Sequence, residues 1–302
     1  MKIVVAGGSG FIGEPLVRRL IARGDDVAVL TRNPSSVHAG RAVSWNPPSE
    51  GGWVEEVANA DAVINLAGEN VGSGRWTAAR KARLMQSRVA ATSALVSAMF
   101  RNRSKSRTFV SASAIGYYDD RGDEPIDERS AAGSGFLAEV TKRWEELART
   151  AEPLARVVIL RVGIVLAANG GALAKLLLPF RLGAGGPMGN GRQWMSWIDR
   201  DDVLRLIEWA IDHDAALGVY NATAPNPVTN RDFARVLGHV LRRPAILPTP
   251  AFALRLALGT EMANEMLLTG ARVLPKRATE EGFEFAHPQL DEALKHAITT
   301  FA

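Results

Sequence analysis

The opening of the chain, "MKIVVAGGSGFIGEPLVRRLIARGDDVAVLTRN", restricts the fold more than any other stretch. The apolar run Lys2–Ala6 predicts a buried strand, and Gly7, Gly10 and Gly13 follow it in the order G-x-x-G-x-x-G. The amphipathic run at residues 13–23 then predicts a helix. A strand, a glycine turn and a helix in this order are typical of the start of a dinucleotide-binding unit.

The same alternation continues along the chain and predicts the fold class. Further strands are expected at residues 26–30, 42–45, 62–67, 107–114, 156–166 and 218–223, and further helices at 77–99, 136–150 and 231–241, where Thr229 or Asn230 is the expected cap. Apolar strands alternating with helices predict a doubly wound parallel α/β sheet of Rossmann type. We expect this domain to comprise residues 1–166 with about 201–223. Residues 167–200 and 224–302 are expected to form a smaller substrate-type lobe.

The glycine turn predicts a phosphate site. The first glycine permits a tight turn, the second lets the backbone approach a pyrophosphate, and the third lets the helix pack closely on the strand. The phosphates then bind to backbone N–H groups at the helix N-terminus. The residues predicted to form this part of the site are Gly7, Gly10, Phe11, Ile12 and Gly13.

The end of the second strand predicts which cofactor is bound. An NAD site usually has Asp or Glu there for the ribose 2′-hydroxyl, whereas an arginine accommodates a 2′-phosphate. This chain has "VLTRN", with Thr31 and Arg32 at that place, so we predict NADP(H) rather than NAD; the alternative is a solvated surface arginine. The remaining cofactor contacts are expected after the next strands, at Leu66, Ala67, Gly68 and Ser111.

Composition excludes several classes of function. The 302 residues include no cysteine, so disulfides, thiolate catalysis and Cys-ligated metals are excluded. The net charge of +4 is small and spread out, so no nucleic-acid partner is expected. No apolar run reaches the roughly 18 residues of a membrane helix and no leader is visible, so we expect a cytoplasmic protein without a membrane. The five histidines are scattered, and no metal site is expected.

Several longer segments resemble a known family. "AGGSGFIG" and "NLAGEN" resemble the extended short-chain dehydrogenase/reductase superfamily, the sugar-nucleotide epimerase-like group. "SASAIGYY", "GFLAEVTKRWE", "NATAPNPVTN" and "GARVLPKRATEEGF" resemble its atypical "epimerase family protein" group, also labelled cell-division-inhibitor-like, with giant-chloroplast-protein relatives. The resemblance covers essentially the whole chain, including a C-terminal family domain at about 248–294. It implies an NADP(H)-binding Rossmann domain and a small lobe, but no known reaction.

The resemblance also shows what is missing from this chain. Active relatives use Ser or Thr at the end of the fifth strand and a Tyr-x-x-x-Lys pair on the next helix, where the tyrosine is the acid or base. Ser113 in "VSASA" matches the serine. The helix has Phe136 or Leu137 in place of the tyrosine and Val140 or Thr141 in place of the lysine. Ordinary oxidoreduction by this pair is therefore not expected.

Substitutes for the missing pair lie nearby. Tyr117 and Tyr118 follow the serine strand by a few residues, so we predict them, with Ser113, as catalytic; the alternative is packing in a turn. Lys142 and Glu139 lie on the right helix, where a solvated helix surface is the alternative.

The predicted substrate contacts are Glu69, Arg192, Gln193, Trp194 and Trp197. In relatives, the region matching "GNGRQWMSWIDRDD" closes over the substrate, and aromatic rings beside Arg and Gln suit a planar or sugar-phosphate ligand. Core packing of the two tryptophans is the alternative.

Two functions follow from the sequence. The first is an NADP(H)-binding atypical dehydrogenase/reductase, epimerase-like, that acts on an unidentified small molecule with hydride transfer beside Ser113. The second is a non-catalytic NADP(H)-binding regulatory or scaffold protein, in cell division. By analogy with the superfamily, a homodimer through the helices beside the fourth and fifth strands is expected.

Overall fold

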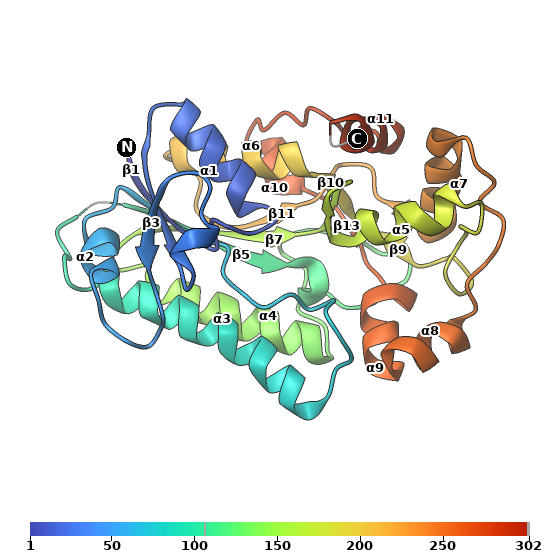
Figure 1. The fold of residues 1–302 in the computed structure, drawn as a ribbon, viewed down its shortest axis with the longest axis horizontal. Helices are drawn as coiled ribbons and strands as arrows, with labels where there is room; N and C mark the ends of the chain where they lie inside the picture. The colour runs from blue at the N-terminus through green and yellow to red at the C-terminus, as the bar shows by residue number, and fades with distance from the viewer. Residues whose placement is uncertain (106, 301–302) are drawn as a thin grey trace.

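The computed structural model describes residues 1–105 and 107–300 and contains one seven-stranded parallel sheet (Figure 1). The strand order is β11-β7-β5-β4-β1-β2-β3, and every neighbouring pair is parallel, which confirms the predicted doubly wound α/β fold. The strands are β1 (Lys2–Ala6), β2 (Asp26–Thr31), β3 (Arg41–Ser44), β4 (Ala62–Asn65), β5 (Thr108–Ala114), β7 (Arg156–Val162) and β11 (Gly218–Ala222).

Helices cover both faces of the sheet because its strands are apolar on both sides. On one face, α1 (Gly13–Ala22) and α6 (Arg200–Asp212) pack in a core with residues such as Ile3 and Val5. On the other, α2 (Trp53–Ala58), α3 (Ala78–Met99) and α4 (Phe136–Arg149) pack in a second core with residues such as Val4. Successive residues of β1 thus point to opposite cores, as strand geometry requires.

The strand order reverses between β1 and β4, and this reversal fixes where a ligand can bind. In open α/β sheets, ligands bind beyond the carboxyl ends of the strands at such a switch point. The register pairs Ala6 with Asn65, and Asn65 with Ser111. The glycine turn, the segment after β4 and the end of β5 therefore share one edge of the sheet.

A smaller lobe lies beside this edge and has its own core, which includes Leu173, Trp197, Phe233 and Leu294. Its helices are α5 (Gly171–Arg181), α7 (Asn230–Leu241), α8 (Ala251–Leu258), α9 (Thr260–Ala263) and α11 (Leu290–Thr299), together with a π-helical turn, η3 (Asn264–Leu268). Its strands are β8 (Ile164–Ala167), β9 (Trp194–Met195), β10 (Trp197–Asp199) and β12 (Val228–Thr229). After η3 the chain returns to the large domain, where α10 (Lys276–Glu280) packs against β11. The lobe was expected to reach residue 302, and residues 301 and 302 lie outside the described part.

Two local features refine the sequence prediction. Thr229 is the cap of α7, because its side chain accepts a hydrogen bond from the Asp232 backbone N–H. The strand predicted at 156–166 is two strands, broken at Gly163. A Cβ atom at Gly163 would lie 2.5 Å from the Ser196 carbonyl oxygen, so the close approach of the two backbones requires glycine there. After this break, β8 leaves the large sheet and pairs with β10.

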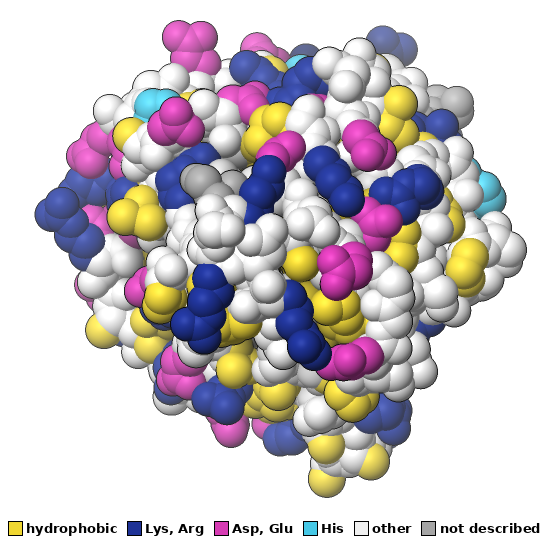
Figure 2. Space-filling view, turned by 90° about the vertical axis from the view of Figure 1, so that its left-hand side faces the viewer, with side chains coloured by type: hydrophobic (Ala, Val, Ile, Leu, Met, Phe, Trp, Pro, Cys, Tyr) yellow, Lys and Arg dark blue, Asp and Glu magenta, His cyan; other side chains and the backbone are white. Residues whose placement is uncertain are grey.

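The surface shown in Figure 2 has Lys and Arg side chains interspersed with Asp and Glu. The small positive net charge is thus not gathered into one patch on this face. Among residues 1–105 and 107–300, no helix combines the length and the apolar character needed to cross a membrane.

Candidate functional site

The glycine turn forms a tight cradle between β1 and α1. Gly7 has φ +82°, and a Cβ atom on it would lie 2.8 Å from the Leu66 carbonyl carbon. A Cβ atom on Gly13 would lie 2.1 Å from the Gly7 carbonyl oxygen, while the Gly10 N–H donates to that same oxygen at 3.0 Å. The N-cap residue, Ile12, has no side-chain capping bond, so no side chain of the cap occupies the helix N-terminus. The turn therefore fits a bound phosphate, with backbone N–H groups as donors.

Phe11 extends from this turn to the small lobe. A Cβ atom on Gly170 would lie 2.4 Å from the Phe11 ring, so the ring packs directly against the backbone before α5. The Arg200 guanidinium lies 5.2 Å from the centre of the same ring. Phe11 therefore joins the turn to the lobe through packing, and its predicted contact with the cofactor stays a prediction.

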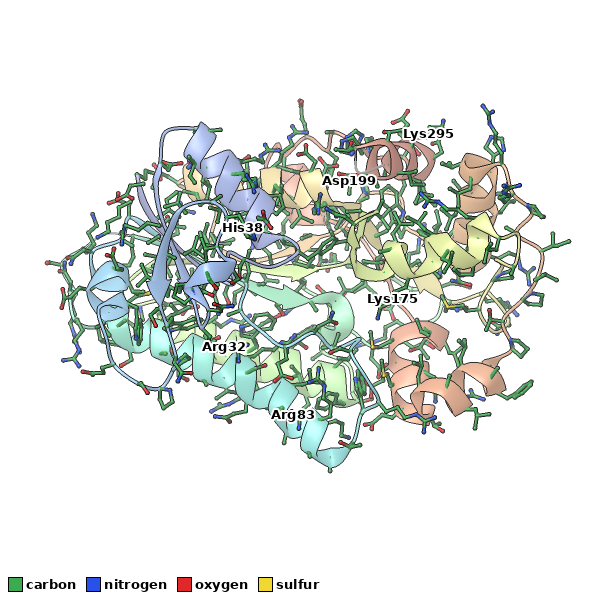
Figure 3. All side chains as sticks on the ribbon, viewed as in Figure 1. Arg32, His38, Arg83, Lys175, Asp199 and Lys295 are labelled. Carbon is green, nitrogen blue, oxygen red and sulfur yellow. The ribbon has the colours of Figure 1, made fainter. Side chains whose placement is uncertain are left out.

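Arg32 follows β2 directly and is exposed (Figure 3). It forms no ion pair with any described residue, and the segment from Thr31 to Gly40 contains no acidic side chain. The Thr31 hydroxyl is used within the turn, where it accepts a hydrogen bond from the Asn33 backbone N–H at 3.1 Å. Arg32 is thus an uncompensated positive charge at the position that distinguishes a 2′-phosphate from a 2′-hydroxyl.

The segment after β4 lies directly against the glycine turn. The Ala67 backbone N–H donates to the Asn65 side chain at 3.2 Å, which fixes the path of Leu66 and Ala67 beside Gly7. Gly68 leaves room for a partly buried arginine, since a Cβ atom on it would lie 3.1 Å from the Arg88 guanidinium carbon.

Arg88 and Glu69 lie beside this segment and contact each other. Arg88 donates to the Glu69 carbonyl oxygen at 3.1 Å, and its guanidinium lies 5.0 Å from the centre of the Trp144 ring. Burial lowers the pKa of Arg88 to about 10, with Glu69 opposing that shift. The carboxylate of Glu69 pairs with Arg80. The predicted substrate residue Glu69 therefore already has a cationic partner.

A buried charged network lies behind the end of β5. The Ser113 hydroxyl donates to Glu145 Oε1 at 2.8 Å, and Arg161 donates to both carboxylate oxygens, from Nε at 2.7 Å and from Nη2 at 2.8 Å. The side chains of Glu145 and Arg161 are only 0% and 3% exposed. The carboxylate and the Tyr118 hydroxyl beside it raise the pKa of Arg161, although burial opposes this. Because its one proton is donated to Glu145, Ser113 can only accept a hydrogen bond from a ligand.

The two candidate tyrosines differ in environment. Tyr118 is fully buried; its hydroxyl donates to Asn221 at 2.7 Å and accepts from Arg161 at 2.8 Å, and burial raises its pKa to about 12. The prediction that Tyr118 faces a ligand is therefore wrong, because it is a core residue of this network. Tyr117 is partly exposed, and its ring lies 3.4 Å from the Arg161 guanidinium carbon.

Ser111 lies within β5. Its side chain is fully buried, and its hydroxyl donates to the neighbouring Ala112 carbonyl oxygen at 3.3 Å. The Ser111 hydroxyl is thus used within β5, and the predicted contact of Ser111 with a cofactor stays a prediction.

The helix α4 has apolar and self-bonded side chains at the positions of the absent pair. Leu137 packs against the turn after β5, where a Cβ atom on Gly116 would lie 2.9 Å from the Leu137 Cβ. Thr141 is buried and donates its hydroxyl to the Leu137 carbonyl oxygen at 2.8 Å. Glu139 and Lys142 lie on the exposed face of the helix. No side chain of α4 therefore replaces the missing tyrosine and lysine.

The small lobe caps the N-terminus of α4. The Glu265 carboxylate accepts hydrogen bonds from the backbone N–H of Phe136 at 3.0 Å and of Leu137 at 2.8 Å. Gly135 precedes the helix with φ +88°, and a Cβ atom on it would lie 3.0 Å from the same carboxylate. A carboxylate there satisfies otherwise unpaired N–H groups and the positive end of the helix dipole.

The lobe residues predicted to bind substrate fall into two groups. Trp197 is fully buried in the lobe core and donates to the Asn226 carbonyl oxygen, so its predicted substrate contact is wrong. Gln193 is partly exposed; its Nε2 donates to the Leu267 carbonyl oxygen at 2.7 Å, while its buried Oε1 has no partner among the described residues. Trp194 donates to Asp123 at 2.9 Å, and Arg192 is exposed.

Two of the five histidines are not scattered in space. His287 and His296 stack with ring centres 4.1 Å apart, and Asp199 lies beside them. The expectation of isolated histidines is wrong for this pair. The two residues are nine positions apart in sequence, and the loop with His287 and the helix with His296 both lie over the start of α6.

Several of these residues had no signal in the sequence. Glu145, Arg161 and Glu265 belong to three separate elements, and each is ordinary in its own segment. The Arg161 guanidinium can be placed beside Ser113 only from the sheet register, which pairs these two residues on β5 and β7.

Two protein-family models match this chain. The model of the NAD dependent epimerase/dehydratase family matches residues 3–223. A domain of unknown function, DUF1731, matches residues 249–297.

Individual proteins are similar over almost the whole chain. An epimerase family protein of Mycobacterium leprae is 39% identical over 299 residues, covering 98% of this chain and 95% of that protein. The chloroplastic homologue of epimerase family protein SDR39U1 from Arabidopsis thaliana is 40% identical over 301 residues, covering 98% of this chain and 86% of that protein. The crystal structure of human epimerase family protein SDR39U1 (isoform 2) with NADPH has a TM-score of 0.90 at 32% identity, covering 100% of both chains.

Proposed function

This chain belongs to the NAD dependent epimerase/dehydratase family, and we propose that it binds NADP(H) and uses it for oxidoreduction or epimerisation of an unidentified small molecule. The observation that supports the cofactor best is the combination of the backbone cradle at Gly7–Gly13 with Arg32. Bound NADP(H) would supply or accept a hydride at the carboxyl edge of the sheet.

The residues of this chain would have distinct tasks in holding the cofactor. The N–H groups at the start of α1 would bind the pyrophosphate, since no side-chain cap competes for them. Arg32 would bind the 2′-phosphate through charge-assisted hydrogen bonds. Leu66, Ala67 and Gly68 would line the site beside the turn. The similar human protein was crystallised with NADPH, which supports the same cofactor here.

Binding titrations test the role of Arg32. NADPH and NADH are titrated against wild type and Arg32→Ala, with heat of binding as the readout. A charge-assisted hydrogen bond contributes about 1.5–3 kcal/mol, so NADPH affinity should fall about 10- to 150-fold while NADH affinity stays the same. The control is Arg18→Ala, an exposed arginine on α1 that pairs with Glu14. An NADPH preference that survives Arg32→Ala contradicts the assignment.

A second substitution tests the cradle itself. In Gly13→Ala the added Cβ would lie 2.1 Å from the Gly7 carbonyl oxygen, so the turn must open and both NADPH and NADH affinity should be lost. Gly52→Ala is the matched control, because a Cβ atom there has nothing within 4 Å. Equal binding by the two variants would show that the cofactor does not lie on this turn.

For the reaction, we propose Tyr117 as the proton donor and Ser113 as an acceptor that orients a ligand hydroxyl. Tyr117 is the candidate tyrosine that remains partly exposed, and its contact with the Arg161 guanidinium places a fixed positive charge against its ring. Gln193, with its unpartnered Oε1, supports a polar ligand between the lobe and the sheet edge. Arg192, Trp194 and Glu69 stay proposed ligand contacts.

A second function is favoured by one specific observation. Phe136 or Leu137 and Val140 or Thr141 stand at the positions of the usual pair, and none of these side chains can act as an acid or base near neutral pH. A non-catalytic protein that binds NADP(H) for regulation or as a scaffold is consistent with this; nothing in the compared proteins described above supports a role in cell division.

Turnover assays distinguish the two functions. Absorbance of NADPH is followed with a panel of aldehydes and ketones, and UDP-sugars with added NADP⁺ are analysed by chromatography for the epimer, because epimerisation leaves no net change in the cofactor. Both assays use wild type, Tyr117→Phe and Ser113→Ala. Turnover in wild type that falls at least about 100-fold in Tyr117→Phe supports catalysis, because acid–base groups contribute on that scale. Tight NADPH binding with no turnover of any compound supports the regulatory function.

A further inference from the structure

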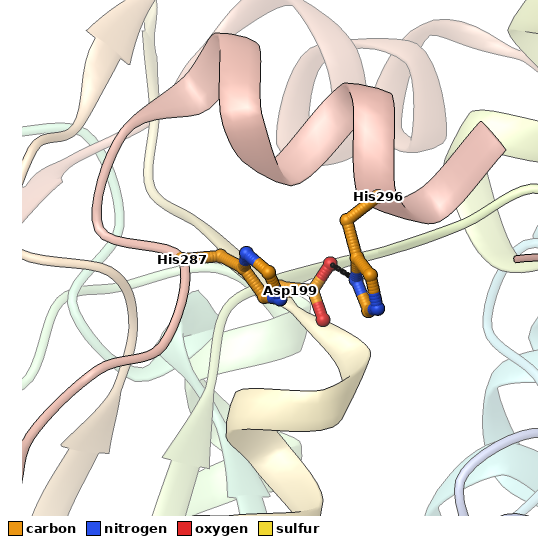
Figure 4. Close-up of side chains that lie close together, drawn as sticks. All are labelled: Asp199, His287 and His296. Carbon is orange, nitrogen blue, oxygen red and sulfur yellow. Dashed lines mark hydrogen bonds and ion pairs between the residues drawn. The ribbon is translucent and has the colours of Figure 1, made fainter. Parts of the chain in front are cut away.

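A cluster of Asp199, His287 and His296 lies outside the cofactor and catalytic residues (Figure 4). Asp199 ends β10 and is the N-cap of α6, His287 lies in the loop before α11, and His296 lies on α11. One possible ligand atom from each residue lies within 4.8 Å of the other two. His296 Nδ1 is 3.0 Å from Asp199 Oδ2, and the two imidazole rings are stacked 19° from parallel.

One oxygen of the aspartate is held by the backbone, and the other faces the histidines. Asp199 is 1% exposed, and its Oδ1 accepts a hydrogen bond from the Asp201 backbone N–H at 2.7 Å. Its Oδ2 is the atom that faces His296, as Figure 4 shows. The cap of α6 thus fixes the carboxylate, and the second oxygen is directed toward the rings.

The loop with His287 is held to the same helix. Asp202, one turn into α6, accepts hydrogen bonds from the backbone N–H of Ala286 at 2.7 Å and of His287 at 3.0 Å. Asp202 is fully buried, so this anchor is protected from water. The backbone positions of all three cluster residues are therefore set by contacts other than those between their side chains.

We propose that Asp199, His287 and His296 bind a divalent transition metal of the zinc type. Two imidazoles and one carboxylate are a ligand set that Zn²⁺ uses, with a fourth position left for water. Bonds of about 2.0–2.2 Å require the ligand atoms to lie about 3.3–3.5 Å apart. The two rings are partly exposed, so side-chain rotation can open the stack and bring their nitrogens around one ion.

The metal would act as a clamp rather than as a reagent. It would connect α11, near the end of the chain, to the start of α6, in place of a single hydrogen bond between His296 and Asp199. Arg200, the next residue, contacts Phe11 of the glycine turn. The clamp is independent of the proposed cofactor chemistry, and binding of the metal is measured without any substrate.

Zinc and cobalt titrations of tag-free, chelator-treated protein test this site. Zn²⁺ affinity is measured by competition with a chromophoric indicator, and Co²⁺ is added separately because its visible spectrum reports the coordination geometry. The variants are His287→Ala, His296→Ala and Asp199→Asn, of which the last keeps an oxygen to cap α6. The control is His239→Ala, an exposed histidine on α7 outside the cluster.

We expect one Zn²⁺ per chain in wild type and in His239→Ala. Loss of a neighbour that only orients a metal ligand already weakens affinity about 10- to 100-fold, so loss of a ligand should weaken it at least tenfold. Zn²⁺ should also raise the midpoint of thermal unfolding in wild type but not in the three variants, which shows the clamp directly. Circular dichroism confirms that each variant is folded before it is titrated.

Three outcomes overturn the proposal. If wild type binds Zn²⁺ with the same affinity as the three cluster variants, the ion binds elsewhere on the protein. Loss of binding in His239→Ala would place the ion at an exposed histidine. A Co²⁺ spectrum identical to that of the hexa-aqua ion in wild type would show that no imidazole enters its coordination sphere.

Discussion

Replacement of Arg161 by methionine should be among the most destabilising single changes in this protein. The substitution removes two hydrogen bonds to Glu145, at 2.7 and 2.8 Å, and one to the Tyr118 hydroxyl at 2.8 Å. It leaves the Glu145 carboxylate buried, with Ser113 and the more exposed Arg149 as its remaining donors among the described residues. Removing one partner of a buried ion pair costs about 3–5 kcal/mol, because the other charge remains without compensation.

A double substitution separates the pair from its parts. In Glu145→Met/Arg161→Met both charges are absent, so no buried carboxylate is left without its partner. The double variant should be more stable than Arg161→Met alone, with a coupling energy of about 0.5–3 kcal/mol. Apolar replacements of buried ion pairs are often close to neutral, whereas single removals are not.

The assay is urea unfolding followed by circular dichroism at neutral pH, with the slope of the transition checked for each variant. The control is Arg149→Met, which loses a pair to the same carboxylate from a side chain that is 42% exposed. An exposed pair contributes about 0–1 kcal/mol. If Arg161→Met is no less stable than Arg149→Met, the reasoning from burial is refuted.

Three further predictions concern other parts of the molecule. Gly135→Ala should destabilise the fold by about 1–3 kcal/mol in thermal or urea unfolding, because it forces a non-glycine residue to φ +88° beside the Glu265 carboxylate; unchanged stability would contradict this. Lys105 lowers the pKa of Asp61, so the stability from Asp61 is present above its unfolded pKa of about 3.9 and is lost as pH falls through the lower folded value. Wild type should therefore lose more stability than Asp61→Asn below about pH 4 in acid unfolding curves, and parallel curves would exclude this contribution. Light scattering should show a homodimer that charged substitutions on the exposed faces of α3 and α4 dissociate; a monomer at every concentration tested would contradict the superfamily analogy.

The sheet could be predicted because its signals are local. The strands β1, β2, β4, β5 and β7 are largely apolar runs of four to seven residues, and the glycine turn has a conformational requirement that three glycines reveal in the sequence. The short helix α2 escaped prediction, since six residues are too few for a clear period. Gly163 was not recognised as a break, because its reason is the Ser196 backbone more than thirty residues later.

The site was predicted less completely because its partners are distant in sequence. The serine at the end of β5 and the absence of the pair on α4 can each be recognised within a single segment of the sequence. The hydrogen bond from Ser113 to Glu145 depends on how α4 packs, and the cap on α4 comes from another lobe. Tyr118 and Trp197 illustrate the same limit, since an aromatic side chain has the same sequence signal in a core as beside a ligand.

The Glu265 cap gives the docking of the small lobe a local kinetic reporter. The amide hydrogens of Phe136 and Leu137 are bonded to a residue about 130 positions later in the chain, so they can exchange with solvent only when that carboxylate leaves. Their exchange rates therefore measure how often the lobe separates from α4, while amides in the middle of α4 measure unfolding of the helix itself. Comparison of these two amides with those in the middle of α4 thus distinguishes opening of the interface from unfolding of the helix.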